Sequence, residues 1–354
     1  MAAAANRARA AGGSIHDRLS ALPNDLLRCV LSLLPAQQAV QTTALSRRWT
    51  DLWRSAPGIN LDMRDFRRTR VLYDVEDPDP SRYQLPHLSF PAGCGLKRLE
   101  LTSVSLDDSF AERLRSWCPD LEDLVLDQCS IGFSRIESDK LKNLVVQYCT
   151  NEPAAADVSV IRAPRLASLR LDNPYHRYEN GVSLYVRNSL ERAFISIGPG
   201  EFPPRSEARL IGSLCGVTNL ELKGFQTMAM LDKEFDKVSI FGNMRTLCLD
   251  SCFYNPSNCD LHKFKAVMRF LQKAPNLEKL TLKNFRVSQV VEPVEYPKLE
   301  NLRTLFLNKC DLHDNFGILQ YCLRNSPNLE PLQALGWFHA RGRKGQVKED
   351  IFSS

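Results

Sequence analysis

The sequence predicts an α/β protein in which a small unit of three helices precedes an open solenoid with a curved parallel sheet. A leucine pattern recurs along most of the 354 residues. Amphipathic segments that end at a proline lie between several copies of the pattern. Residues 17–62 lack the pattern and show apolar residues at helical spacing instead. Together these observations indicate one helical unit followed by stacked strand-containing repeats.

Each copy of the repeat has an apolar residue, two mostly polar residues, an apolar residue, one further residue and a second apolar residue. Alternate side chains of a strand share one face, so the last two apolar residues, usually leucines, both point inward. No single copy can bury its own leucines, and we therefore expect the copies to stack as leucine-rich repeats. The copies begin at Leu96, Leu121, Leu141, Leu166, Val217, Met244, Leu277 and Leu302, with a degenerate copy at Leu190 and a last copy that runs from Leu329 to Leu332.

The eighth position after the start of a copy is also restricted, and it accounts for four of the eleven cysteines. A compact apolar group fits there, where the chain turns off the strand. The odd number of cysteines and the absence of a glycosylation sequon are typical of a reducing compartment, and we expect the nucleus and/or the cytoplasm. The residues at this position are Cys129, Cys149, Cys252 and Cys310, and elsewhere Phe225, Phe285 or Val104.

The segments between copies indicate helices. Residues 110–118, 264–274 and 318–326 are amphipathic, and a proline follows each of them directly. Proline stops a helix and passes the chain to the next strand. We therefore expect each repeat to consist of one strand and one helix.

Residues 17–62 predict three short helices. A wide apolar face runs from Leu22 to Leu34, Pro35 ends that helix and opens the next, and Ser46 is placed to cap a third that carries Trp49, Leu52 and Trp53. So small a unit cannot bury this much apolar surface alone. The surplus predicts a surface for a partner.

This segment closely resembles an F-box of the plant F-box/leucine-rich-repeat family, which is related to the FBD proteins. The matching pieces are Leu22-Pro23, Asp25–Leu27, Leu31–Pro35, Ala39-Val40 and Leu45–Trp49 with Leu52-Trp53. The resemblance implies a substrate-recognition subunit of an SCF-type cullin ubiquitin ligase. Its F-box would dock the Skp adaptor and, through it, a cullin, and its repeats would bind an unidentified substrate protein. The C-terminal FBD module of many relatives is not found in the sequence.

The resemblance gives the predicted fold its full form, a trihelical F-box followed by an open leucine-rich-repeat solenoid. Two other functions stay open at this point: a non-degradative F-box/Skp scaffold and a small-molecule receptor. The predicted segments are a flexible tail at 1–16, the F-box at 17–62, a linker or degenerate first repeat at 63–95, the leucine-rich repeats at 96–332 and a C-terminal tail at 333–354. The Skp-binding residues are expected among Leu22, Pro23, Leu26, Leu27, Val30, Leu31, Leu34, Pro35, Val40, Leu45, Trp49, Leu52 and Trp53.

The sequence offers little for chemistry or for other partners. We find no Gly-X-Ser-X-Gly, no P-loop and no His-Glu-X-X-His, so we expect no catalytic residues. A zinc site at Cys248, Cys252, Cys259 and His262 is an alternative interpretation, but Cys252 already fills a repeat position, and we expect no metal and no cofactor. The net charge of +5 and the lack of an 18-residue apolar run favour neither nucleic acid nor membrane as a partner.

Overall fold

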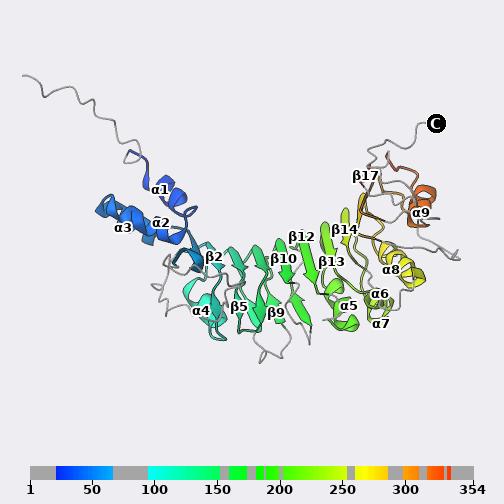
Figure 1. Ribbon diagram of the computed structural model, residues 1–354, viewed down its shortest axis with the longest axis horizontal. Coiled ribbons are helices and arrows are strands. Elements are labelled where there is room, and N and C mark those ends of the chain that lie inside the picture. Colours follow the sequence, from blue (N-terminus) through cyan, green and yellow to red (C-terminus); the bar gives the residue numbers. More distant parts are fainter. Residues whose placement is uncertain are drawn as a thin grey trace, which may run out of the picture.

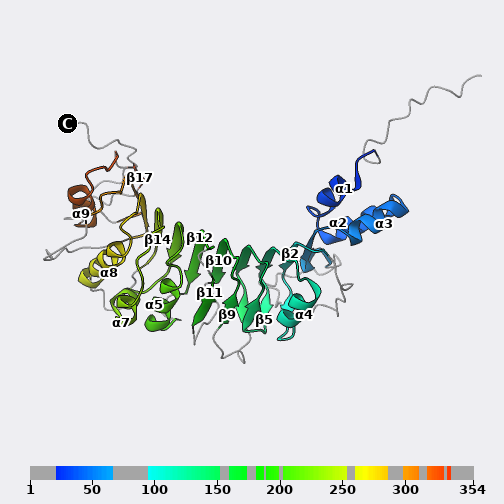
Figure 2. The ribbon, with the colours of Figure 1, turned by 180° about the vertical axis from the view of Figure 1, so that it is seen from behind.

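The computed structural model describes residues 21–66, 95–151, 159–173, 181–186, 189–198, 202–252, 260–285, 298–310, 317–330 and 333–335. They form an arc with a small helical unit at its N-terminal end (Figure 1). The long strands stand side by side along the inner side of the arc. Helices and shorter strands cover the outer side, which the reverse view also shows (Figure 2). The predicted curved solenoid is confirmed.

The helical unit consists of α1 (Asn24–Leu31), α2 (Ala36–Gln41), a 3-10 turn (Thr42–Ala44) and α3 (Arg47–Arg54). Pro35 holds an extended conformation directly before α2, so it separates two helices as the sequence predicts. Ser46 directly precedes α3, although its hydroxyl makes no capping hydrogen bond. The unit has a small core of its own, separate from that of the solenoid.

The main sheet has eleven parallel strands in one continuous order. Their register places equivalent leucines side by side, for example Leu220 beside Leu247 and Leu247 beside Leu280. The repeat pattern therefore predicts the sheet correctly. The strands are β1 (Gly58–Asp62), β2 (Arg98–Thr102), β4 (Asp123–Asp127), β7 (Asn143–Gln147), β10 (Ser168–Asn173), β12 (Arg192–Ile197), β13 (Asn219–Lys223), β14 (Thr246–Asp250), β15 (Lys279–Lys283), β16 (Thr304–Asn308) and β17 (Gln333–Leu335).

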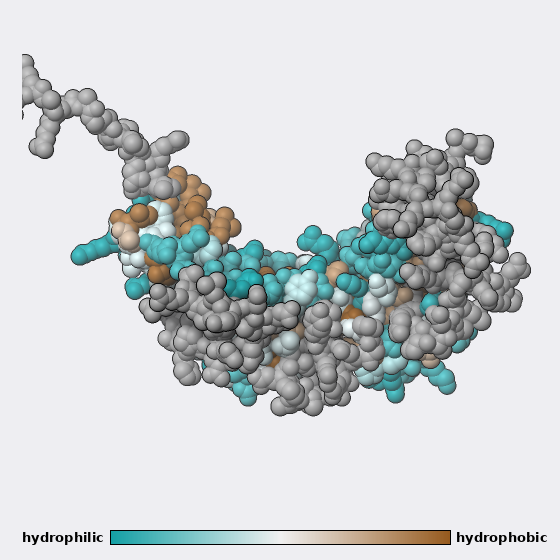
Figure 3. Space-filling view, in the orientation of Figure 1, coloured by the Kyte–Doolittle hydropathy of each residue, from teal (hydrophilic) through white to brown (hydrophobic). Residues whose placement is uncertain are grey.

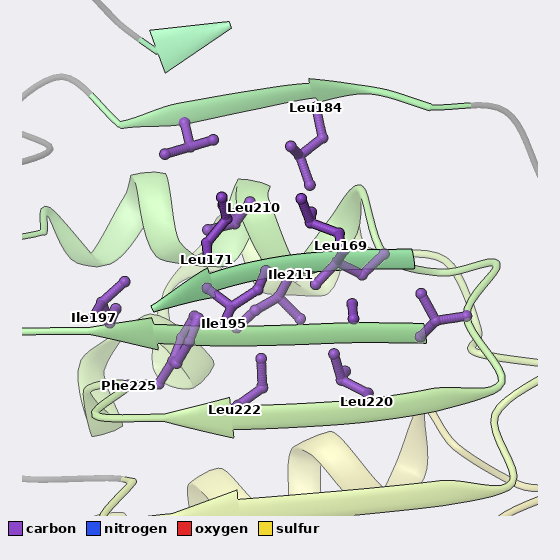
Figure 4. Packing of buried hydrophobic residues seen from close by; sticks show 14 of the residues in the cluster. Leu169, Leu171, Leu184, Ile195, Ile197, Leu210, Ile211, Leu220, Leu222 and Phe225 are labelled. Carbon is purple, nitrogen blue, oxygen red and sulfur yellow. The ribbon is translucent and has the colours of Figure 1, made fainter. Parts of the chain in front are cut away.

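The strand leucines form one continuous core along the solenoid. Figure 4 shows Leu171, Ile195 and Leu222 of three neighbouring strands pointing into the layer that also holds Leu210 and Ile211 of an outer helix. All five side chains are buried. Each fully buried leucine or isoleucine contributes roughly 1.5–3 kcal/mol, and the repetition of this contribution holds the stack together.

The outer layer differs from the expectation of one helix per repeat. Between α4 and α5 it consists of the short strands β6 (Arg135–Glu137), β9 (Ser159–Arg162) and β11 (Val182–Tyr185), which pair with one another. The copy that begins at Leu121 is short, with 20 residues against 25 for the copy at Leu96 that forms α4, and β-branched residues such as Ile136, Val160 and Ile161 in the outer segments favour strands. The outer helices are α4 (Phe110–Trp117), α5 (Pro204–Gly212), α6 (Thr227–Leu231), α7 (Lys233–Asp236), α8 (Asp260–Gln272) and α9 (Gly317–Asn325), and a further small sheet joins β3 (Ser105–Leu106), β5 (Ser130–Ile131) and β8 (Thr150–Asn151).

The sheet extends beyond both predicted ends of the repeats. Strand β1 lies inside the predicted F-box range and pairs with β2, and a bridge between Pro35 and Asn60 ties it to the helical unit. Strand β17 lies inside the predicted C-terminal tail, where Ala334 takes the position of a strand leucine. The predicted tail at 1–16 and most of the predicted linker at 63–95 lie outside the described residues.

The turn that follows seven of the main-sheet strands repeats as closely as the strands themselves. Six non-glycine residues hold a left-handed conformation with φ of 51–56°, and Gly224 holds φ of 81° at the same repeat position. The next residue is buried, and where it is cysteine its thiol donates a hydrogen bond to the carbonyl of the preceding strand, as Cys252 does to Leu222 at 3.2 Å. These cysteines are therefore structural, as the sequence predicts. The six residues are Ser103, Gln128, Tyr148, Ser251, Asn284 and Lys309.

Candidate partner-binding surfaces

A cluster of exposed apolar side chains lies on the helical unit (Figure 3). Among the described residues, ten large apolar side chains are exposed, and five of them fall between positions 26 and 45. A single exposed leucine is ordinary, but several within so short a segment indicate an interaction surface. We call this cluster the N-terminal apolar patch; it comprises Leu26 (53% exposed), Val30 (44%), Leu33 (79%), Val40 (43%) and Leu45 (65%).

The patch follows from helix geometry. Residues four apart lie one above the other on a helix, so α1 carries two apolar stripes. Leu27 and Leu31 form the stripe that packs inward, whereas Leu26 and Val30 form a second stripe that faces outward. The core of the unit is already filled by α3, and among the described residues no other side chain of that core covers the second stripe.

The structure divides the thirteen predicted Skp-binding residues. Four of them are buried in the core of the helical unit and expose almost nothing of their side chains: Leu27, Leu31, Trp49 and Leu52. Leu22, Leu34 and Trp53 are half-buried against that core, and Pro35 is half-buried beside β1. The exposed members are Pro23, Leu26, Val30, Val40 and Leu45.

Leu33 was not among the predicted residues, although it is the most exposed member of the patch. It follows the last turn of α1 and so falls outside the helical spacing that marks its neighbours. The run Leu31-Ser-Leu-Leu34 holds three leucines in four positions, more than one face of a short helix end can bury. That excess is the sequence signal for Leu33.

Two arginines fix the position of α1 against α3. Arg48 Nη2 donates hydrogen bonds to the Leu22 carbonyl and to Asn24 Oδ1, both at 2.7 Å. Arg28 Nε donates to Ser55 Oγ at 3.0 Å, and its Nη1 lies 2.8 Å from Asp25 Oδ1. Arg48 and Trp49, which belong to the predicted F-box motif, therefore both stabilise the helical unit. Arg48 orients the start of α1, and Trp49 fills the core.

The second candidate surface is the concave face of the main sheet. Each strand has residues between its buried positions whose side chains point to the concave face. We call these the outward positions because they point away from the core. The register aligns them in rows that run across the strands. In the centre of the middle row, Val125, Val145 and Phe194 are half-buried, and the Arg170 guanidinium lies 4.0 Å from the Phe194 ring centroid. Such a face combines apolar contact area with aligned polar groups.

Farther along the same row, one cysteine lies in a polar setting. Lys283 Nζ lies 2.9 Å from Glu221 Oε1, and the Cys248 thiol donates to the same oxygen at 3.4 Å. Burial, and then the Glu221 carboxylate, raise the pKa of Cys248 to about 11, so the thiol stays protonated near neutral pH and is a poor nucleophile. Cys252 donates into the core, Cys259 lies outside the described residues, and no group of three metal-ligating side chains occurs in the described part of the chain.

A hollow of about 380 Å³ lies on the outer side beside α4. It occurs where α4 is followed by β6 instead of another helix. Its floor is apolar, and its rim includes Arg115, whose Nη1 lies 3.7 Å from Glu137 Oε2.

Among the helices of the described ranges, none has the length and apolar character needed to cross a bilayer.

The comparisons with known proteins agree with this architecture. Residues 31–189 match the family model for the leucine-rich repeats of the FBD-associated F-box protein At5g56370. That match begins in α1 and runs through the first repeats. The rice (Oryza sativa subsp. japonica) meiotic F-box protein MOF is 28% identical over 76% of this chain and 71% of its own length. This chain is similar to members of the plant F-box/leucine-rich-repeat family.

One further relative matches most of this chain, and another matches a short segment at higher identity. F-box/LRR-repeat protein 13 of Arabidopsis thaliana is 25% identical over 82% of this chain and 81% of its own length. The F-box/FBD/LRR-repeat protein At5g22660 of the same plant is 50% identical, but over 51 residues only. The names of these relatives join an F-box with leucine-rich repeats, and the structure shows a three-helix unit joined to a repeat sheet. We therefore call residues 21–57 the F-box unit.

Proposed function

We propose that this chain is the substrate-recognition subunit of an SCF-type cullin ubiquitin ligase. Its N-terminal apolar patch binds the Skp adaptor, and the concave face of its repeats binds a target protein in the nucleus and/or the cytoplasm. The observation that supports this proposal best is the patch itself, because half of the exposed large apolar side chains of the described residues lie on the F-box unit. The family relationship supports the same role.

We expect the two most exposed members of the patch to contribute most to the free energy of adaptor binding. Leu33 and Leu45 expose more of their side chains than the other three. Burial of apolar surface contributes about 25 cal/mol per Å² removed from water. A few well-buried side chains usually dominate an interface. We therefore expect Leu33 and Leu45 to contribute more to adaptor binding than Val30 or Val40.

The mechanism requires no covalent chemistry of this chain. A ligase subunit of this kind accelerates transfer by holding lysines of the target near a ubiquitin-charged enzyme bound elsewhere in the complex. The arc suits this role because the F-box unit lies at one end and the strands present their outward positions along the inner side (Figure 1). Strand β1 joins the two parts, so the position of a bound target is coupled to the adaptor.

The experiment is co-expression of the full chain with a Skp adaptor, followed by affinity purification and size exclusion. We expect the unaltered chain to elute as a stoichiometric complex and the Leu26→Asp/Leu33→Asp variant to elute alone. Leu323→Asp is the matched control, because Leu323 is an exposed leucine on α9 at the other end of the arc. Retention of the adaptor by the Leu26/Leu33 variant, or its loss from the Leu323 variant, contradicts the proposal.

Two further measurements separate the alternatives. A non-degradative scaffold binds the adaptor equally well. When the Leu26→Asp/Leu33→Asp variant replaces the unaltered chain, however, the half-life and ubiquitylation of the scaffold's partner stay unchanged.

The hollow beside α4 is large enough for a small ligand, which favours a receptor as the second candidate. A receptor shows a melting temperature that rises with the concentration of its ligand.

A further inference from the structure

The charges on the concave face are divided along the solenoid. We compare the outward positions of the first five strands, β1 to β10, with those of the described strands from β12 onward. The first group has five carboxylates and two guanidiniums: Asp62, Glu100, Asp123, Asp127 and Asp172 with Arg98 and Arg170. The second group has four cations and two carboxylates: Arg192, Lys223, Lys279 and Lys283 with Glu221 and Asp250. The face is therefore acidic toward the F-box unit and basic toward the far end.

Two carboxylates of the acidic half form no ion pair among the described residues. Asp62, Glu100 and Asp172 pair with Arg64, Arg98 and Arg170. Asp123 and Asp127, both on β4, have no such pair. Asp123 accepts a hydrogen bond from the Asn143 amide, and Asp127 accepts one from Gln147.

Of these two carboxylates, Asp127 has the greater need for a compensating cation. Its Oδ1 is shielded from solvent and has no hydrogen-bond partner within the described ranges. Burial raises the pKa of this carboxyl, and the hydrogen bond from Gln147 and the charge of Arg64 oppose that rise only in part. A cation supplied by a partner would add to that partial compensation.

The basic half mirrors this arrangement in the same two rows. Lys223 occupies the row of Asp127, and Lys279 occupies the row of Asp123. Both lysines are exposed, and neither has an anionic partner within the described part of the chain. Lys283, by contrast, is already held by Glu221 at 2.9 Å.

The middle row between the two charged ends carries apolar side chains. Val125, Val145 and Phe194 lie in the middle row, and Tyr148 stands exposed at the exit edge of β7. The Arg170 guanidinium stacks on the Phe194 ring and is also paired with Asp172, so its charge is satisfied within the face. Along the concave face, a partner would therefore meet carboxylates first, then apolar side chains, and then lysines.

We propose that the concave face binds an extended segment of a protein in which basic and acidic residues are segregated, with an apolar residue between them. The basic residues lie over β4 and the acidic residues over β13 and β15. This step rests on the proposed role of the repeats in holding a target. Four strand spacings separate β4 from β13, roughly 19 Å, which an extended chain spans with about six residues.

The test uses two fluorescein-labelled peptides of one composition, with two lysines, one leucine, two glutamates and small neutral spacers. In the block peptide the lysine pair and the glutamate pair lie about six residues apart on either side of the leucine, and in the alternating peptide the charges alternate. Fluorescence anisotropy is measured on the full chain at low ionic strength, alone and in complex with a Skp adaptor. We expect the block peptide to bind at least tenfold more tightly than the alternating peptide.

Charge variants at both ends locate the site. We expect Lys223→Glu/Lys279→Glu and Asp123→Asn/Asp127→Asn each to weaken binding of the block peptide at least tenfold. Lys265→Glu is the matched control, because Lys265 is an exposed lysine on the outer helix α8, and it should leave the affinity unchanged. Circular dichroism melting of each variant verifies that the solenoid is folded.

Equal affinity for the two peptides, no binding of either peptide, or an affinity that none of the concave variants changes overturns the inference. Failure here is distinguishable from failure of the proposed function. A chain that keeps its adaptor complex but shows no preference for the block peptide contradicts only the segregated-charge site. A chain that prefers the block peptide but binds no adaptor contradicts only the ligase role.

Discussion

The left-handed residue after each strand shows how one backbone requirement is met by different side chains. Gly224 shares its repeat position with Ser251, Asn284 and Lys309, which hold similar conformations without being glycine. Left-handed φ alone therefore does not demand glycine here, although it costs about 1 kcal/mol for other residues. What distinguishes Gly224 is space, because a Cβ there would lie 2.2 Å from the Ile197 carbonyl oxygen.

The Gly224→Ala variant should therefore lose about 3 kcal/mol or more of stability, since the backbone of β12 or of the turn must move. Lys309→Gly is the matched control at the same repeat position. It should change stability by less than about 1 kcal/mol, because relief of the left-handed conformation offsets the greater entropy of the unfolded chain. Urea denaturation followed by circular dichroism measures both, and equal stability of Gly224→Ala and the unaltered chain would refute the steric explanation.

Glu207 is a buried carboxyl within the solenoid. It lies in α5, its Oε2 accepts a hydrogen bond from the Gln226 backbone N–H at 3.0 Å, and its Oε1 has no partner among the described residues. Burial raises the pKa of Glu207 to about 8, and the hydrogen bonds from Gln226 oppose that rise only in part. Near neutral pH the folded protein therefore keeps a proton that the unfolded chain releases.

This proton makes stability depend on pH. Between the ordinary pKa of 4.5 and about 8 the folded state holds the extra proton, so stability should fall by up to about 1.4 kcal/mol per pH unit as the pH rises. Glu207→Gln, which cannot ionise, should lose this contribution and be the more stable form at pH 8. Melting temperatures of the two proteins from pH 5 to 9 measure the difference, and parallel curves would show that Glu207 does not titrate as described.

Sequence reasoning was effective at this scale where a residue belongs to a repeating position. Cys129, Cys149, Cys252 and Cys310 are buried as their shared position predicts. It could not identify Glu207, because a glutamate in an amphipathic segment ordinarily faces solvent, and only the packing of α5 against α6 places it inside. It also could not divide the F-box leucines into inner and outer sets, since both stripes of α1 fit helical spacing.

At the scale of the element, the strand alternation sets which side chains hold the fold and which meet a partner. Leu280 and Lys279 are neighbours on β15, but Leu280 is fully buried and Lys279 is exposed on the concave face. Leu280→Ala should cost about 2–5 kcal/mol because it leaves a cavity in the core. Lys279→Ala should change stability by less than about 0.5 kcal/mol. Chemical denaturation of the pair tests the assignment, and comparable losses would contradict it.

Helices were predictable where a proline ends an amphipathic segment, as at α4 and α9. They were wrongly expected in the copies that begin at Leu121 and Leu141, where β6 and β9 take their place. A strand covers the core with fewer residues than a helix, because each residue advances about 3.3 Å instead of 1.5 Å. The 20 residues of the copy at Leu121 therefore favour β6. The copy at Leu141 is as long as the copy at Leu96, which forms α4, so β9 follows from its β-branched residues Val160 and Ile161 instead.

At the scale of the whole molecule, two cores are joined through one strand. The F-box unit has its own core, whereas Ile59 and Leu61 of β1 pack against the core of the solenoid. The sequence predicts both parts and their order, and Ile59-Asn-Leu61 indicates a degenerate first strand, which β1 confirms. The division of charge on the concave face, by contrast, is visible only once the register of the strands is known.

The central claim is that the adaptor binds the N-terminal apolar patch and leaves the repeats free for a target. Hydrogen–deuterium exchange of the full chain, alone and with a Skp adaptor, tests it most directly. We predict slower exchange in residues 24–45 on addition of the adaptor, and no change in strands β4 to β16. Protection that falls on those strands, or no protection in residues 24–45 of a chain that binds the adaptor, would contradict the account.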